Sequence, residues 1–254
     1  LRTVHEQDLL VGLVGSPQFG LMRLAKETAC LSARGQGHVY VGPKLARDVP
    51  WDWTGFMGLD VLVLCDPDWS QFKPQQVKAI CEWASNGGTV LLVLGRHPLP
   101  QDSPLRAAIP FQIGEPLQVE IPSLAMDAWG LDSSRPQTVT AWPLSAKLGT
   151  PMPARIQPET GSLHGTGRLG FGRVAMLAFD PAQLTGAQAE RAAAFWANQI
   201  AACIGEATDP SNATDTVSAA GRGRRIVLTG SPSESDPQAG SNPYDNRHRI
   251  GVGQ

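Results

Sequence analysis

The chain has 254 residues, of which 42% are hydrophobic and 17% are charged, and its formal net charge is -2 at pH 7. This length allows one or two domains with a sizeable core, and the lack of a basic surplus argues against a nucleic-acid-binding protein. No apolar run reaches the roughly 20 residues that a membrane-spanning helix requires. The four cysteines are too widely spaced for a zinc site or a redox pair, so we expect neither a metal nor another cofactor.

Alternating strands and helices dominate the first 95 residues. Four short runs rich in apolar residues and bounded by turn residues predict strands: 9–14, 38–41, 59–65 and 89–95. Apolar residues at helical spacing predict helices over 19–33 and 74–85, the second with Pro74 in its first turn and Ile80 on its buried face. This alternation predicts a doubly wound, mostly parallel sheet between two layers of helices, which is an α/β fold.

The alternation ends at Gly95. Residues 98–170 are rich in proline and glycine and contain short β-like segments such as 117–121 and 138–142. We interpret this region as a β-rich insertion or as added strands. Residues 165–170 match the pattern Gly-x-Gly-x-x-Gly literally, but a strand follows them where the dinucleotide fingerprint needs a helix. These glycines are therefore expected to shape a turn.

A returning strand and a final helix complete the predicted domain, which extends over residues 1–205. The strand is expected at 172–179, and the helix is expected to begin with a capping box formed by Thr185 and Gln188. Over 206–254 the composition shifts to serine, aspartate, proline, glycine and asparagine. This shift predicts a low-complexity tail or linker.

The carboxyl ends of the strands are where an open parallel sheet binds its ligands. The polar residues near those ends are therefore the ligand-binding candidates: Ser16, Asp66, Asp68, Arg96, His97 and Asp180. At the same edge, Cys65 and His97 could form the thiol–imidazole pair that nucleophilic catalysis uses. We do not expect catalysis by Cys65, because its bulky and acidic neighbours do not fit a nucleophile elbow. A nearby carboxylate also raises the pKa of a thiol.

A metal is a second alternative at this edge. Asp66 and Asp68 alternate along an extended segment, so both carboxylates could bind Mg²⁺ from one side. Aspartates in such a place more often cap the turn that contains them. We therefore predict no metal site.

Three segments carry a resemblance to a known family. Residues 45–95 read LARDVPWDWTGFMGLDVLVLCDPDWSQFKPQQVKAICEWASNGGTVLLVLG, residues 170–181 read GFGRVAMLAFDP, and the last helix contains Phe195 and Trp196. Through them the chain resembles the class I glutamine amidotransferase-like domains of large, membrane-anchored bacterial proteins of unassigned role. The resemblance implies a flavodoxin-like, three-layer fold over residues 9–205.

The resemblance does not extend to the catalytic triad. Active class I amidotransferases carry a nucleophilic cysteine in a Gly-x-Cys-x-Gly turn after the strand that corresponds to 89–95. Here that turn reads Val-Leu-Gly-Arg-His over 93–97, and no His-x-Glu pair follows in the sequence. Amidotransferase activity is therefore not expected.

The expected function is a non-catalytic binding or interaction domain of a larger bacterial envelope protein. Its partner would be a protein or a small molecule, and segments outside this chain would anchor it in the membrane, as the resemblance implies. The alternative is a hydrolase or transferase that uses Cys65, or a metal held by Asp66 and Asp68, at the carboxyl edge of the sheet.

Overall fold

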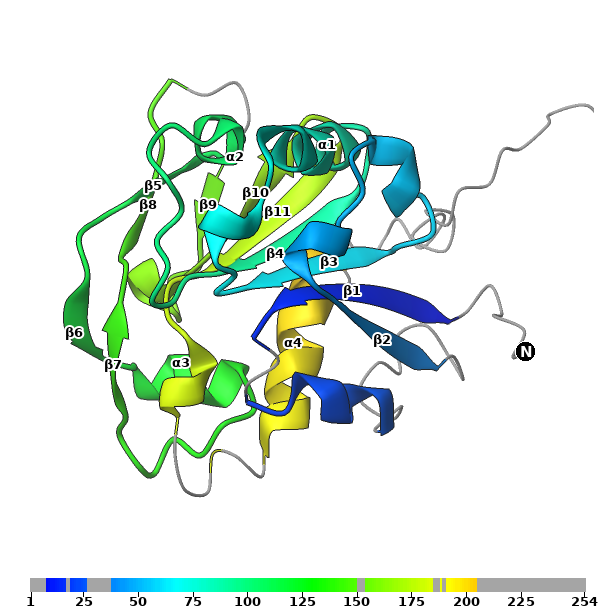
Figure 1. Cartoon of the computed structure of the whole chain (residues 1–254). Coiled ribbons are helices and arrows are strands. Elements are labelled where there is room, and N and C mark those ends of the chain that lie inside the picture. The colour runs from blue at the N-terminus through cyan, green and yellow to red at the C-terminus, as the bar shows by residue number, and fades with distance from the viewer. Residues whose placement is uncertain are drawn as a thin grey trace, which may run out of the picture. The chain divides into compact units, whose positions relative to one another are not determined.

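A seven-stranded sheet forms the centre of the structure, a computed structural model (Figure 1). The residues described are 8–16, 19–26, 38–149, 154–184, 188 and 191–204. The predicted tail and Thr185 lie outside them. None of the helices in these ranges is long and apolar enough to cross a membrane.

The strands of this sheet follow the order β2-β1-β3-β4-β11-β10-β9. Their bounds are Leu9–Gly15 (β1), Val39–Lys44 (β2), Val61–Cys65 (β3), Thr89–Val93 (β4), Ala154–Ile156 (β9), His164–Leu169 (β10) and Gly172–Leu177 (β11). The first five in spatial order pair in parallel, and β10 and β9 add an antiparallel edge. Because β1 is followed by β2 on one side and by β3 on the other, the strand order reverses between β1 and β3.

Helices cover both faces of the sheet, which gives the predicted three layers (Figure 1). On one face lies α1, Pro74–Ser85, and on the other lie α4, Ala192–Ile204, and the 3-10 helix η1, Leu21–Lys26. Ile80 is fully buried, whereas Lys78 faces solvent and pairs with Glu82 at 3.6 Å. The predicted bounds and phase of α1 are therefore confirmed.

The insertion after β4 contains helices as well as strands. Its elements are α2 (Pro104–Ala108), β5 (Phe111–Ile113), β6 (Leu117–Glu120), α3 (Ser123–Ala128), β7 (Thr138–Ala141) and β8 (Leu144–Ala146). β5 pairs with β8 and β6 with β7, both antiparallel, and these ribbons lie beyond the carboxyl ends of the parallel strands (Figure 1). The two short helices were not predicted.

Several predicted elements differ from the observed ones. Within the described part of 19–33, the chain forms the 3-10 helix η1 instead of an α-helix. Of the expected capping box, Thr185 lies outside the described residues, and the side-chain amide of Gln188 binds both main-chain groups of Asp132, at 2.8 and 2.9 Å. In the glycine-rich motif, Gly165 and Gly167 belong to β10, and only Gly170 lies in the turn before β11.

Short 3-10 helices make up the remaining regular structure of the described residues. They are η3 (Ala46–Asp48), η4 (Trp53–Phe56), η5 (Trp69–Gln71), η6 (Gly161–Leu163) and η7 (Pro181–Gln183). Asp52, Asp68 and Asp180 each accept a main-chain hydrogen bond at the start of η4, η5 and η7. The loops of the sheet are thus held by aspartate caps.

His164 at the start of β10 makes the stability of this fold sensitive to acid. It is buried, and within the described structure neither ring nitrogen has a hydrogen-bond partner. Burial lowers the pKa of His164 to about 4, because a charged imidazolium would lose its hydration. Since the unfolded chain binds this proton near pH 6.5 and the folded chain does not, stability is full above that pH and falls as the pH drops towards 4.

We predict that lowering the pH from 7 to 5 costs about 2 kcal/mol of unfolding free energy through His164 alone. The measurement is urea unfolding of the wild type and of His164→Leu at both pH values. The variant should lose less stability on acidification by about that amount. An equal loss in both proteins would show that His164 is not the responsible group.

Candidate functional site

The structure brings the six predicted candidates and Cys65 together at the carboxyl edge of the sheet. These residues are called the carboxyl-edge cluster below: Ser16, Cys65, Asp66, Asp68, Arg96, His97 and Asp180. Asp66 and Asp180 both act electrostatically on Cys65, Arg96 acts on Asp180, and His97 acts on Asp68. These residues come from the ends of β1, β3, β4 and β11. Their convergence is what parallel strands with aligned carboxyl ends produce.

Asp66 ties the end of β3 to the segment after β4. Its backbone φ is 42°, in the left-handed region that aspartate tolerates better than most residues. Its Oδ1 accepts the main-chain N–H of His97 at 2.8 Å and lies 3.3 Å from Nδ1 of the same residue. The carboxylate therefore fixes the loop and orients an imidazole that is half exposed.

Cys65 is unsuited to act as a nucleophile in this geometry. Its residue is only 1% exposed. Burial raises the pKa of its thiol strongly, and the carboxylates of Asp180 and Asp66 raise it further. Because the thiolate is the reactive form, this environment keeps the sulfur protonated and inert near neutral pH.

Asp180 has an environment that favours its neutral form. Burial raises the pKa of this carboxyl group and the charge of Asp66 adds to that, whereas a hydrogen bond from Ala182 and the charge of Arg96 oppose it. The Ala182 N–H donates to Oδ1 at 2.9 Å, which caps η7. Asp180 therefore joins the cluster while serving as a turn cap.

Asp68 is occupied within its own turn. One carboxylate oxygen accepts the main-chain N–H and the hydroxyl of Ser70, at 3.0 and 2.6 Å, and the other accepts from Gln71 at 3.0 Å. These hydrogen bonds lower the pKa of the Asp68 carboxyl group, and the one from the Ser70 hydroxyl has the largest effect. The carboxylate of Asp68 therefore caps its own turn, whereas the carboxylate of Asp66 binds His97 in another loop. Within the described residues no group of three or more histidines, cysteines or acids is placed to hold a metal ion.

The main chains of β1 and β3 lie close together at their carboxyl ends, where the strand order reverses. The N–H of Ser16 donates to the carbonyl of Cys65 at 2.8 Å. Gly15, with φ of 105°, lies so close that an added Cβ would be 2.1 Å from the same carbonyl oxygen. No side chain fits at position 15 without a shift of this backbone.

The insertion covers the same edge from the outside. Trp142 donates its indole N–H to the carbonyl of Gly95 at 2.9 Å and its main-chain N–H to Ala178 at 2.7 Å. An isolated antiparallel bridge also joins Ala141 to Phe179. The ends of β4 and β11 are therefore both attached to the insertion.

Several hollows among the described residues lie away from this edge. One, of about 310 Å³, is a mainly apolar groove between the β1–β2 side of the sheet and the loop of η3 and η4. Gln76 in α1 holds that loop through hydrogen bonds to Ala46 and Val49, at 3.0 and 2.7 Å. Leu45, Trp51 and Met57 on the same loop are exposed.

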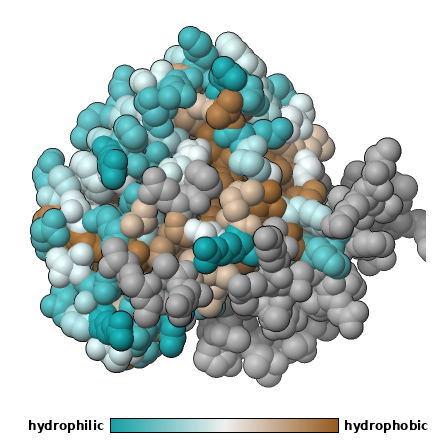
Figure 2. All heavy atoms as spheres, turned by 60° about the horizontal axis from the view of Figure 1, so that its bottom comes forward, coloured by the Kyte–Doolittle hydropathy of each residue, from teal (hydrophilic) through white to brown (hydrophobic). Residues whose placement is uncertain are grey.

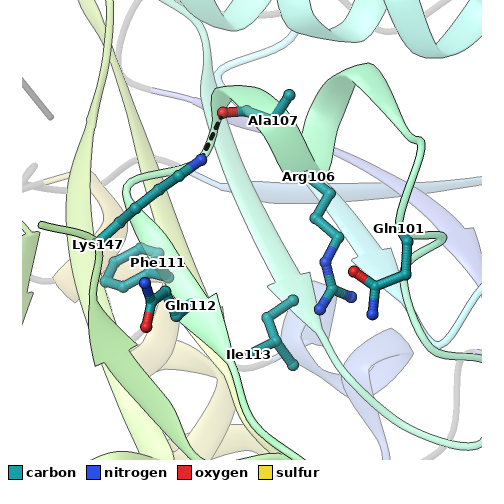
Figure 3. Close-up of a pocket in the computed structure, with 7 residues that line it drawn as sticks. All are labelled: Gln101, Arg106, Ala107, Phe111, Gln112, Ile113 and Lys147. Carbon is teal, nitrogen blue, oxygen red and sulfur yellow. Dashed lines mark hydrogen bonds between the residues drawn. The ribbon is translucent and has the colours of Figure 1, made fainter. Parts of the chain in front are cut away.

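Another hollow, of about 400 Å³, lies in the insertion (Figure 3). It is lined by Gln101, Arg106, Ala107, Phe111, Gln112, Ile113 and Lys147. Sequence reasoning missed it, because its residues come from α2, β5 and the segment after β8 and share no motif. The sequence signal was limited to two basic residues in a region interpreted as a β-rich insertion or as added strands.

No known family and no curated protein matches the chain. Among solved structures, a cytoplasmic protein from Salmonella typhimurium LT2 is similar, with a TM-score of 0.54, 16% identity, and coverage of 77% of this chain and 99% of that one. Another cytoplasmic protein from Salmonella typhimurium gives 0.51, 15%, 77% and 98%. At such identities the likeness concerns the fold alone. With the observed topology, it confirms the predicted α/β class with a mostly parallel, flavodoxin-like sheet.

We predict that Gly95→Ala will disturb the carboxyl-edge cluster. An added Cβ would lie 2.4 Å from Cγ of Asp66, so the carboxylate must move and lose its hydrogen bond to His97. The expected loss of unfolding free energy is about 1–3 kcal/mol in urea unfolding. Gly58→Ala, where an added Cβ meets nothing within 4 Å, is the matched control and should cost little.

In an Asp66→Gly background the clash partner is absent, so Gly95→Ala should then be nearly neutral. This double-mutant cycle isolates the contact between the two positions. A full penalty in the Asp66→Gly background would mean that another neighbour, and not the carboxylate, rejects the side chain.

Proposed function

We propose that this chain is a binding or interaction domain that does not use its carboxyl edge for catalysis. The observation that carries the proposal is the burial of Cys65 at the end of β3, where its carbonyl accepts the N–H of Ser16 and only 1% of the residue is exposed. A covalent mechanism needs a thiolate that substrate can reach. Both requirements conflict with this geometry.

The surface offers other places for a partner. The groove over β1 and β2 is mainly apolar, and three large apolar side chains are exposed on its loop. On the opposite side, which carries α4, Figure 2 shows apolar surface gathered across the middle of the molecule. Apolar surface of this kind is typical of interaction sites.

A hydrolase or transferase remains the second candidate, and the pair of Asp66 and His97 is the observation that favours it. A carboxylate 3.3 Å from Nδ1 would orient the ring, as it does in general-base histidines. Without an accessible nucleophile this pair alone completes no catalytic site. The exposed imidazole could equally serve in ligand binding.

We also propose that the domain belongs to a larger membrane-anchored envelope protein, which rests on the family resemblance of its segments and not on this fold. Translating the complete reading frame tests this part. An apolar run of roughly 20 residues outside the present chain is expected. A frame without such a run would contradict the anchoring.

The thiols provide the test of the non-catalytic role. We predict that in the folded protein at pH 7 iodoacetamide labels Cys65 more slowly than Cys81. Cys81 is half-buried, with the pKa of its thiol raised by burial to about 11, whereas Cys65 is enclosed. Mass spectrometry of the digested protein identifies the labelled residue.

Turnover of glutamine and of simple esters is measured alongside, with Cys65→Ser and His97→Ala as variants. No turnover above background is expected from the wild type. Rapid labelling of Cys65 below about pH 7, or an activity that either variant abolishes, would replace the binding role with an enzymatic one.

A further inference from the structure

The hollow in the insertion brings two cationic side chains to one concave surface. Arg106 comes from the last turn of α2, and Lys147 follows β8. Figure 3 shows Arg106 beside Gln101 on one side of the hollow and Lys147 on the other side, with its ammonium directed at the carbonyl of Ala107. A volume of about 400 Å³ is within the range of small-molecule sites.

Arg106 is held so that part of its guanidinium remains available. One Nη donates to the carbonyl of Leu99 at 2.8 Å, which fixes the side chain across the loop before α2. A guanidinium has five N–H donors, so one such bond leaves most of them unused. No ion pair with Arg106 is present in the described part of the chain.

Main-chain groups at the end of α2 take part in positioning Lys147. Its N–H donates to the carbonyl of Pro110 at 2.9 Å, and its Nζ donates to the carbonyl of Ala107 at 3.0 Å. These contacts attach the segment after β8 to the end of α2. They hold the ammonium at the wall of the hollow, so less side-chain entropy is lost when a ligand binds.

The other lining residues define the rest of the ligand. Gln101 and Gln112 supply neutral amide groups, while Phe111 and Ile113 supply aromatic and aliphatic wall, and none of the seven lining residues is acidic. Two cations without an acidic residue in the lining favour an anion, and the apolar wall favours an organic body attached to it.

We propose that this hollow binds a small organic molecule through a carboxylate or phosphate group, with Arg106 contacting the oxyanion. The inference rests on the proposed role as a binding domain and specifies its ligand class. A solvated surface arginine would have the same charge. It would not be tethered to Leu99 at the wall of a hollow whose opposite side holds a second fixed cation.

The probes are benzoate and phenyl phosphate, with benzamide as the neutral analogue, titrated into the ¹⁵N-labelled protein at low salt. We expect at least one anion to shift the amide resonances around the hollow, with a dissociation constant below about 10 mM and clearly tighter than benzamide. The preferred anion identifies the oxyanion. Added salt should weaken binding.

Three variants define the site. Arg106→Gln and Gln112→Glu should each weaken the anion at least about tenfold, the first by removing a charged donor and the second by adding a repelling carboxylate. Arg47→Gln, at an exposed arginine of η3 outside the lining, should leave affinity unchanged. If Arg106→Gln fails to fold, Gln112→Glu decides alone, because Gln112 is exposed.

The inference is overturned if neither anion binds below about 10 mM, or if Arg47→Gln weakens binding as much as the lining variants. Those results would leave the non-catalytic role untouched. Conversely, turnover that depends on Cys65 would end the binding-domain proposal without affecting anion binding in the insertion. The two experiments therefore fail independently.

Discussion

The close approach of β1 and β3 at their carboxyl ends is the constraint on which the rest of this edge depends. Gly15 can take its positive φ and approach the carbonyl of Cys65 because it has no side chain. The N–H of Ser16 then satisfies that carbonyl. Where these two backbones meet, Cys65 is buried at the end of β3, and Asp66 and Asp180 lie near enough to act on its thiol.

The polar side chains of the carboxyl-edge cluster connect the loops that follow the strands. Asp66 joins the end of β3 to the loop after β4, Gly95 makes room for its carboxylate, and Trp142 covers the carbonyl of Gly95 from the insertion. Each polar group in this sequence of contacts meets another, as buried polar groups require. The residue types that suggest catalysis in the sequence are therefore also those that a tightly sealed strand edge needs.

The parts that the sequence predicts well are those with a long or strongly biased pattern. The twelve residues of α1 carry a complete buried stripe and an initial proline, and the apolar strands β3 and β4 are buried throughout. The strands β5 to β8 have three or four residues each, too few for a periodic signal. The hollow near Lys147 could not be predicted, because its contact with Ala107 spans 40 residues without any shared motif.

The insertion is also fastened to the helical layer. Gln188 binds both main-chain groups of Asp132, Asn198 of α4 donates to Ala128 at 3.3 Å, and the ring of Trp129 packs on Phe195 with centroids 5.9 Å apart. Insertion, sheet edge and α4 should consequently open together as one cooperative unit instead of fraying separately. Any ligand held by the insertion alone would then protect backbone amides deep in the sheet from hydrogen exchange. Binding at a peripheral hollow would therefore raise the free energy of unfolding of the whole domain.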